Sequence, residues 1–292
     1  STAFTQIKRN VLISGGLPIG PALSEFTLEF PESHMSILSR FTQHIRFIKA
    51  AAASETIRIV ALFDAVVSTP GVIMPWKAMV KICHAEGITS IVDAAHSLGQ
   101  ESVFDLSEIQ PDFWIGVSKW LYAKRGSAVL YVARKNQHLI PNDIPAGLSW
   151  VEPEEHKQTM SQFAGEFYWN GSADVVLPLT VIAALDFRSK IGGEKRIIDY
   201  CHALAVNGGR RVAEILGTQV MDMPETSGEL IGTMVNVLLP LSKTIRPSPS
   251  VTRAVDHKLF HEQRAYAVTY YHNNHWWVRI SAQVYNQVCL SS

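Results

Sequence analysis

The sequence has few cysteines, no net charge and no long hydrophobic run. Its 292 residues include three cysteines, and neither a CxxC nor an HExxH motif occurs. We therefore expect no disulfide framework and no metal site. The 26 basic and 26 acidic residues balance without a basic stripe, so we expect no nucleic-acid partner. The apolar stretches are well short of the roughly 20 residues that a membrane helix requires.

The first ten residues contain neither the apolar segment nor the cleavage site of a secretory signal. We therefore expect a cytoplasmic protein with reduced cysteines and no membrane partner. With 47% hydrophobic residues, a chain of this length can bury a substantial core and suits one large domain or two modest ones.

Apolar, β-branched runs of strand length alternate with helical patterns in the first half of the chain. One helical pattern opens at Pro75 and ends at Gly87, where a glycine C-terminal cap is expected. This alternation predicts an α/β fold with a mainly parallel sheet covered on both faces. The predicted strands are 57–63, 88–92, 112–118 and 127–133.

The second half predicts a smaller α+β unit. Two long amphipathic helices are interrupted by a pair of glycines, and three strands follow them. We place the domain boundary so that 1–190 form the large domain and 191–292 the small one. The predicted helices are 175–191 and 194–216, the strands are 233–239, 265–271 and 275–281, the hairpin turn is 272–274, and 243–250 form a surface loop.

Asp93 and Lys119 each follow a predicted strand, so both can face the crevice beyond the carboxyl ends of a parallel sheet. Pyridoxal 5'-phosphate (PLP) needs such a pair: an amine to form an imine and a carboxylate to keep the pyridine nitrogen protonated. The spacing alone leaves alternatives open. A strand-end aspartate is a common helix N-cap, and a lysine among aromatic residues is often a surface residue.

Four segments together resemble the class V aminotransferases, a family of PLP-dependent enzymes with the aspartate-aminotransferase-like fold. The resemblance extends from about residue 57 to 286 and is greatest to isopenicillin N epimerase-like proteins and hercynylcysteine sulfoxide lyases. The segments are VDAAH at 92–96, SKWLYAKRG at 118–126, YWNGSAD at 168–174 and WVRISAQVYN at 277–286.

The resemblance implies how the cofactor is held. Lys119 would form the Schiff base and later move the α-proton, and Asp93 would pair with the pyridine nitrogen. His96 would contact the ring oxygen or face of the cofactor; alone, it would more often be a helix-start or core histidine. Ser118 stands where the family commonly has a phosphate-binding histidine, so that contact would lack a charge. Ser68 would face the cofactor side.

The resemblance also implies a homodimer and a substrate contact. Gly171 and Ser172 would reach the phosphate of the neighbouring subunit, although an ordinary turn is the alternative. Arg279 would bind the α-carboxylate of an amino-acid substrate by a bidentate fork, with a structural salt bridge as its alternative. Trp169 would wall the site or belong to the core.

The expected reaction is C–S bond cleavage or α-carbon epimerisation of an amino acid. Desulfurase chemistry is less expected, because residues 264–278 contain no nucleophilic cysteine. The family has a longer segment before strand 57–63 and a further helix after residue 288, so we expect a chain truncated at both ends. A non-catalytic homologue that binds PLP weakly, or an unrelated α/β binding protein, is the alternative.

Overall fold

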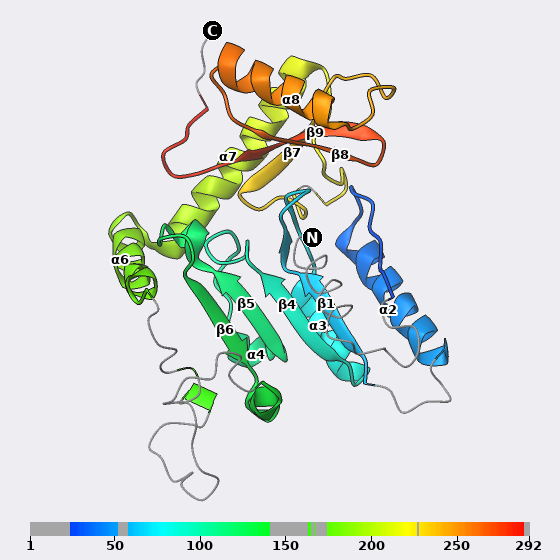
Figure 1. The fold of residues 1–292 in the computed structure, drawn as a ribbon, viewed down its shortest axis with the longest axis vertical. Helices are drawn as coiled ribbons and strands as arrows, with labels where there is room; N and C mark the ends of the chain where they lie inside the picture. Colours follow the sequence, from blue (N-terminus) through cyan, green and yellow to red (C-terminus); the bar gives the residue numbers. More distant parts are fainter. Residues whose placement is uncertain are drawn as a thin grey trace, which may run out of the picture.

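A computed structural model describes residues 24–51, 58–140, 163–164, 167, 174–226 and 228–288. The larger sheet lies in the lower half of Figure 1 and has the order β1-β4-β5-β6. Strands β1, β4 and β5 are parallel, and β6 runs antiparallel to β5. This arrangement confirms the predicted mainly parallel α/β sheet. The strands are β1 Val60–Asp64, β4 Thr89–Ala94, β5 Phe113–Val117 and β6 Ala128–Val132.

The main hydrophobic core lies between this sheet and two helices. Helix α3 (Trp76–Ala85) packs against β1 and β4, and α2 (His34–Ala51) packs against α3. Phe41 of α2 meets Phe63 of β1 edge to face, with ring centroids 5.8 Å apart. Apolar residues recur on one side of α3 because its sequence has helical periodicity. Core side chains from these elements include Ile37, Phe41, Trp76, Met79, Val80, Val92 and Trp114.

A second sheet, of order β7-β9-β8, lies above the first in Figure 1, with helix α7 packed against it. Strands β8 and β9 form the predicted hairpin, and Asn273 and Asn274 at its turn have φ angles of 47° and 59°. Asparagine tolerates this left-handed conformation better than most residues. The elements are α6 Val176–Lys190, α7 Gly193–Leu216, β7 Met234–Leu238, α8 Pro249–His257, β8 Val268–His272 and β9 His275–Ser281.

Several predicted boundaries were wrong by a few residues. Asp93 does not follow its strand but lies within β4, because pairing with β1 and β5 continues to the strand end. The strand predicted at 265–271 begins at Val268. The predicted loop 243–250 ends in helix α8, whose first turn is capped by the Ser248 hydroxyl at 3.3 Å from the Val251 amide nitrogen.

Short elements were also missed: β2 Val66–Val67, β3 Val72–Ile73, α4 Leu106–Ile109 and three short turns of helix, Ser118–Leu121, Arg134–Leu139 and Lys258–Glu262.

Buried polar side chains join the two sheets. Asn236 of β7 accepts a hydrogen bond from the Gly71 amide at 3.2 Å and donates one to the Gly71 carbonyl at 3.1 Å. Gly71 lies in the loop between β2 and β3. Gln100 donates to the His96 carbonyl at 2.6 Å and accepts from the Thr233 hydroxyl at 2.7 Å. Because Asn236 bonds to the Gly71 backbone and Gln100 bonds to the Thr233 hydroxyl, the two sheets have a defined relative position.

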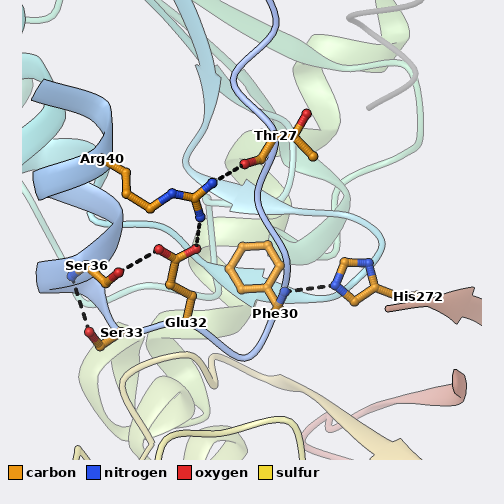
Figure 2. Close-up of polar contacts among 7 residues, drawn as sticks. All are labelled: Thr27, Phe30, Glu32, Ser33, Ser36, Arg40 and His272. Carbon is orange, nitrogen blue, oxygen red and sulfur yellow. Dashed lines mark hydrogen bonds and ion pairs between the residues drawn. The ribbon is translucent and has the colours of Figure 1, made fainter. Parts of the chain in front are cut away.

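The segment before α2 also reaches the second sheet (Figure 2). The Phe30 amide donates to Nε2 of His272, at the end of β8, at 2.9 Å. Glu32 accepts hydrogen bonds from the Ser36 hydroxyl at 2.7 Å and from Arg40 at 2.6 Å. Its negative charge therefore lies at the N-terminus of α2, where the helix dipole favours an anion.

No helix in the described parts of the chain is both long and apolar enough to cross a membrane. Within the same residues, no group of three or more potential metal ligands is close enough to bind an ion. The boundary between residues 190 and 191 stays a prediction.

Two adjacent glycines of α7 test the packing of this helix on the second sheet. A Cβ at Gly209 would lie 2.5 Å from Cγ2 of Val235, whereas a Cβ at Gly208 meets nothing nearer than Val288 at 3.9 Å. We expect Gly209→Ala to lower the free energy of unfolding by about 1–3 kcal/mol through overpacking. Gly208→Ala should raise it by up to about 1 kcal/mol through helix propensity. Urea unfolding midpoints measure both, and equal shifts would contradict this packing.

Candidate active site

Three parallel strands end at one edge of the larger sheet, and ionisable residues gather there. Asp64 of β1 and Asp93 of β4 are paired in register. In-register residues of neighbouring parallel strands project from the same face, so the two carboxyl groups lie side by side. Lys119 lies in the short helix Ser118–Leu121, directly after β5. The predicted acid and amine therefore lie at the ends of adjacent strands of one sheet.

His96 lies between the lysine and a tryptophan. Its Nε2 is 3.0 Å from the Lys119 amine, and its Nδ1 accepts a hydrogen bond from the Trp120 indole at 3.2 Å. An indole N–H can only donate, so Nδ1 carries no proton and the neutral ring is protonated at Nε2. The Nε2 proton of this tautomer faces the Lys119 amine at 3.0 Å, which favours the uncharged form of the amine.

The electrostatic surroundings favour the same protonation states. Burial, the nearby Lys119 charge and Arg279 lower the pKa of His96 to about 4, so the ring is neutral near pH 7. Burial also lowers the pKa of Lys119, and Arg279 lowers it further, whereas Asp93 acts in the opposite direction. A lysine with a depressed pKa is the form suited to nucleophilic attack and proton transfer.

Arg279 of β9 reaches toward this edge from the second sheet. Its Nη1 donates a short hydrogen bond to the Ser68 carbonyl, and its Nε is buried without a hydrogen-bond partner in the described structure. None of the described carboxylates forms an ion pair with it, and burial lowers its pKa. A half-buried guanidinium without an anion favours ligand binding over a structural salt bridge.

The donor set matches the chemistry of PLP. The cofactor needs an amine, a carboxylate for its nitrogen and donors for its oxygens, and Lys119, Asp93 and His96 provide these groups at one edge of the sheet. Ser118 is fully buried, and its hydroxyl has no hydrogen-bond partner among the described residues. A buried hydroxyl without a partner is costly unless a ligand satisfies it, so the residues fit the cofactor.

Of the other predicted site residues, the structure describes Ser68 alone. Ser68 lies in the loop between β2 and β3, and its carbonyl, not its hydroxyl, contacts Arg279. Gly171, Ser172 and Trp169 lie outside the described residues, so their roles stay predictions.

Two residues of this edge were missed from the sequence. Trp120 was noticed only as part of a motif, although its indole determines the proton position on His96. Asp64 directly follows the strand predicted at 57–63 and was given no role. A signal was present, because two consecutive apolar runs end in aspartate, but the register that pairs Asp64 with Asp93 requires the folded sheet.

This fold is that of the PLP-dependent enzymes of fold type I, as predicted. The profile of the family Aminotransferase class-V matches residues 42–238, and the chain belongs to that family. PLP is the cofactor of this family, so the predicted cofactor class is confirmed.

Curated relatives and solved structures agree with this assignment. The chain is 32% identical to an L-cysteine desulfhydrase-like protein from Epichloe uncinata, over 89% of this chain and 64% of that protein. It is 32% identical to hercynylcysteine sulfoxide lyase from Schizosaccharomyces pombe, over 61% of this chain and 44% of that one. The apo cysteine desulfurase from Thermococcus onnurineus has the same fold, with a TM-score of 0.67 and 20% identity over 96% of this chain and 66% of that one. The chain thus spans less than two thirds of each relative.

The charges around Lys119 predict opposite effects of two substitutions on its pKa. Arg279→Met removes a cation, so the pKa of Lys119 should rise. Asp93→Asn removes an anion, so the pKa should fall. The pKa of Lys119 can be measured by competitive acetylation of the PLP-free protein between pH 7 and 11. Mass spectrometry gives the extent of acetylation, and the exposed Lys81 is the internal reference. Shifts in the same direction would show that neither charge acts on Lys119.

Proposed function

We propose that this chain carries the PLP-binding core of an enzyme that cleaves a C–S bond in a cysteine-derived amino acid. The observation that carries the proposal is the Lys119 amine, which lies 3.0 Å from Nε2 of His96 at the same sheet edge as Asp93 and has a lowered pKa. The names of the desulfhydrase-like and sulfoxide lyase relatives support C–S cleavage. Epimerisation is the alternative, because it needs the same residues and a relative is an isopenicillin N epimerase. A homologue that has lost catalysis is the second alternative.

Each residue has a distinct task in this proposal. PLP, when bound, supplies an electron sink that stabilises negative charge at the substrate α-carbon. Lys119 provides the covalent attachment point and takes the α-proton through its Nζ atom. Asp93 keeps the proton on the pyridine nitrogen, and His96 and Ser118 offer donors to the cofactor's oxygens. Arg279 orients the substrate through its carboxylate.

A desulfurase reaction is not supported by the two cysteines that the structure describes. Such chemistry requires an accessible thiolate near the substrate. Cys83 and Cys201 are both buried, and burial raises the pKa of Cys83 to about 12. These thiols therefore remain protonated at neutral pH and cannot serve as nucleophiles.

The attachment of PLP at Lys119 is testable by chemical trapping. Protein incubated with PLP and reduced with borohydride should show the adduct on the peptide that contains Lys119. Lys119→Ala should abolish the adduct because the amine is lost, whereas Lys124→Ala, five residues further along, should retain it. Mass spectrometry of the digested protein locates the modification, and an adduct on another lysine would overturn the assignment.

The role of Arg279 is testable by separating substrate binding from cofactor binding. Lysine cannot reproduce a bidentate fork, so Arg279→Lys should lower kcat/KM by about 30-fold to 1000-fold, which corresponds to roughly 2–4 kcal/mol. PLP retention in the absence of substrate should stay near the wild-type value. Titration with L-cysteine and cysteine conjugates, followed by absorbance, provides the measurement. A variant that loses PLP, or one that binds amino acids as tightly as the wild type, would contradict this role of Arg279.

We also propose that the active unit is a homodimer in which Gly171 and Ser172 reach the neighbouring subunit's phosphate. Helix α6 supports an interface, because its apolar side chains are widely exposed, including Leu179 at 61% and Ile182 at 70%. Exposed apolar patches of this kind mark association surfaces.

Charge placed on α6 tests this interface. Ile182→Glu should shift the protein from dimer to monomer in sedimentation equilibrium, because a buried unpaired carboxylate opposes association. Ile215→Glu is the matched control, since Ile215 of α7 is similarly exposed at 69%. A wild-type monomer that binds PLP tightly would refute the cross-subunit role.

A further inference from the structure

We propose that Asp64 is a positioning residue for Asp93. When protonated, it donates a hydrogen bond to the Asp93 carboxylate, and when ionised, it adds a second negative charge beside the site of the cofactor's nitrogen. The inference rests on the proposed role of Asp93 and assigns to that site a dependence on pH.

The geometry of the sheet brings the two carboxyl groups together. Asp64 and Asp93 are in-register partners on β1 and β4. The Ala65 amide donates to the Asp93 carbonyl at 2.8 Å, which continues the pairing past the end of β1. Lys119 follows β5, on the other side of β4. Asp64 therefore flanks Asp93 on the side opposite the lysine strand.

The Asp93 carboxylate has a neighbour on each of two sides. Its Oδ1 accepts a hydrogen bond from the Ala95 amide at 3.0 Å, and Asp64 lies on the other side as its in-register partner. Two neighbouring carboxylates repel each other when both are ionised, so the pair favours retaining one proton. Because Asp93 already receives a backbone amide, the proton belongs on Asp64.

The surroundings place the ionisation of Asp64 close to neutrality. Burial, followed by the charge of Asp93, raises its pKa to about 6. Among the described residues, Asp93 is the ionisable group that acts on Asp64. Lys119 faces Asp93 from the end of β5, and Arg279 and Arg125 act on Lys119 in turn. The proton on Asp64 is therefore governed by its partner on β4.

This ionisation has a consequence for the free protein. The pKa of Asp64 is higher in the folded state than its ordinary value of about 3.9, so the folded state binds the proton more tightly. The resulting stabilisation is present at low pH and is lost as the pH rises from about 4 to 6. Above pH 6 the folded protein carries two adjacent negative charges.

A bound cofactor responds to the same charge. A protonated pyridine nitrogen is a cation, so a second anion beside Asp93 strengthens its attraction to the site. The contribution of Asp64 to PLP affinity should therefore be small at pH 5 and increase as the pH passes through 6.

The first experiment needs no cofactor. Carbon-13 NMR of aspartate-labelled, PLP-free protein should show one carboxyl that titrates near pH 6. That titration should disappear in Asp64→Asn and move to lower pH in Asp93→Asn, which lacks the like charge. Asp105→Asn is the matched control, since the exposed Asp105 caps a helix and has a lowered pKa; it should leave the titration near pH 6 intact. No carboxyl titrating near pH 6 in the wild type would overturn the proposal.

Thermal unfolding of the same PLP-free proteins gives a second reading. Asn carries no charge, so Asp64→Asn should raise the melting temperature at pH 8 relative to wild type. The difference should shrink toward zero at pH 4, where Asp64 is neutral in both the folded protein and much of the unfolded ensemble. Asp64→Ser, which also retains a donor, replaces it if the asparagine variant does not fold. An equal shift at both pH values would indicate packing alone.

Equilibrium dialysis with PLP then tests the link to the cofactor. The ratio of Kd values, Asp64→Asn over wild type, should be near one at pH 5 and about five to ten at pH 8. The ratio cancels the titration of PLP itself. A ratio that does not change with pH would refute the cofactor link. If PLP fails to bind the wild type, the proposed function fails, while the NMR titration still decides whether Asp64 holds a proton against Asp93.

Discussion

The register of β4 between β1 and β5 is the constraint on which the candidate site depends. A slip by one residue would turn Asp93 to the opposite face of the sheet. Side chains fix this register at the other end of the strands. Asp112 accepts from the Ser90 amide at 2.9 Å, and its own amide donates to the Ser90 hydroxyl at 3.0 Å. This buried pair, far from the chemistry, therefore determines where the carboxylate points.

The state of the lysine depends on how the two sheets join. Arg279 belongs to the second sheet, yet its charge is the second largest cause of the lowered pKa of Lys119. The bonds of Asn236 to Gly71 hold that sheet against the loop between β2 and β3, where Ser68 contacts the guanidinium. Burial first, and then the nearby Arg279 cation, lower the pKa of the amine, and the packing of the two sheets keeps that cation in place.

Much of the fold and part of the site could be predicted from the sequence. Local sequence predicts the parallel strands, the hairpin turn and the positions of Asp93 and Lys119. Apolar runs, turn residues and strand ends can each be recognised from consecutive residues. The Asp64–Asp93 pair, the Trp120 bond to His96 and the contact of Arg279 with a carbonyl are not local. They depend on which strands become neighbours and in what register. Helix α8 was missed for a different reason, because its proline-rich start resembles a loop although proline suits a first helical turn.

The amide of Gln100 makes the two sheets mechanically dependent. It is 1% exposed and bonded on one side to the His96 carbonyl and on the other to Thr233, in the segment that leads into β7. Rotation of the second sheet away from the first would leave a buried amide oxygen without a partner, at a cost of about 1–3 kcal/mol. Because the same side chain also holds the His96 carbonyl, the place of the histidine beside Lys119 depends on how the second sheet is seated.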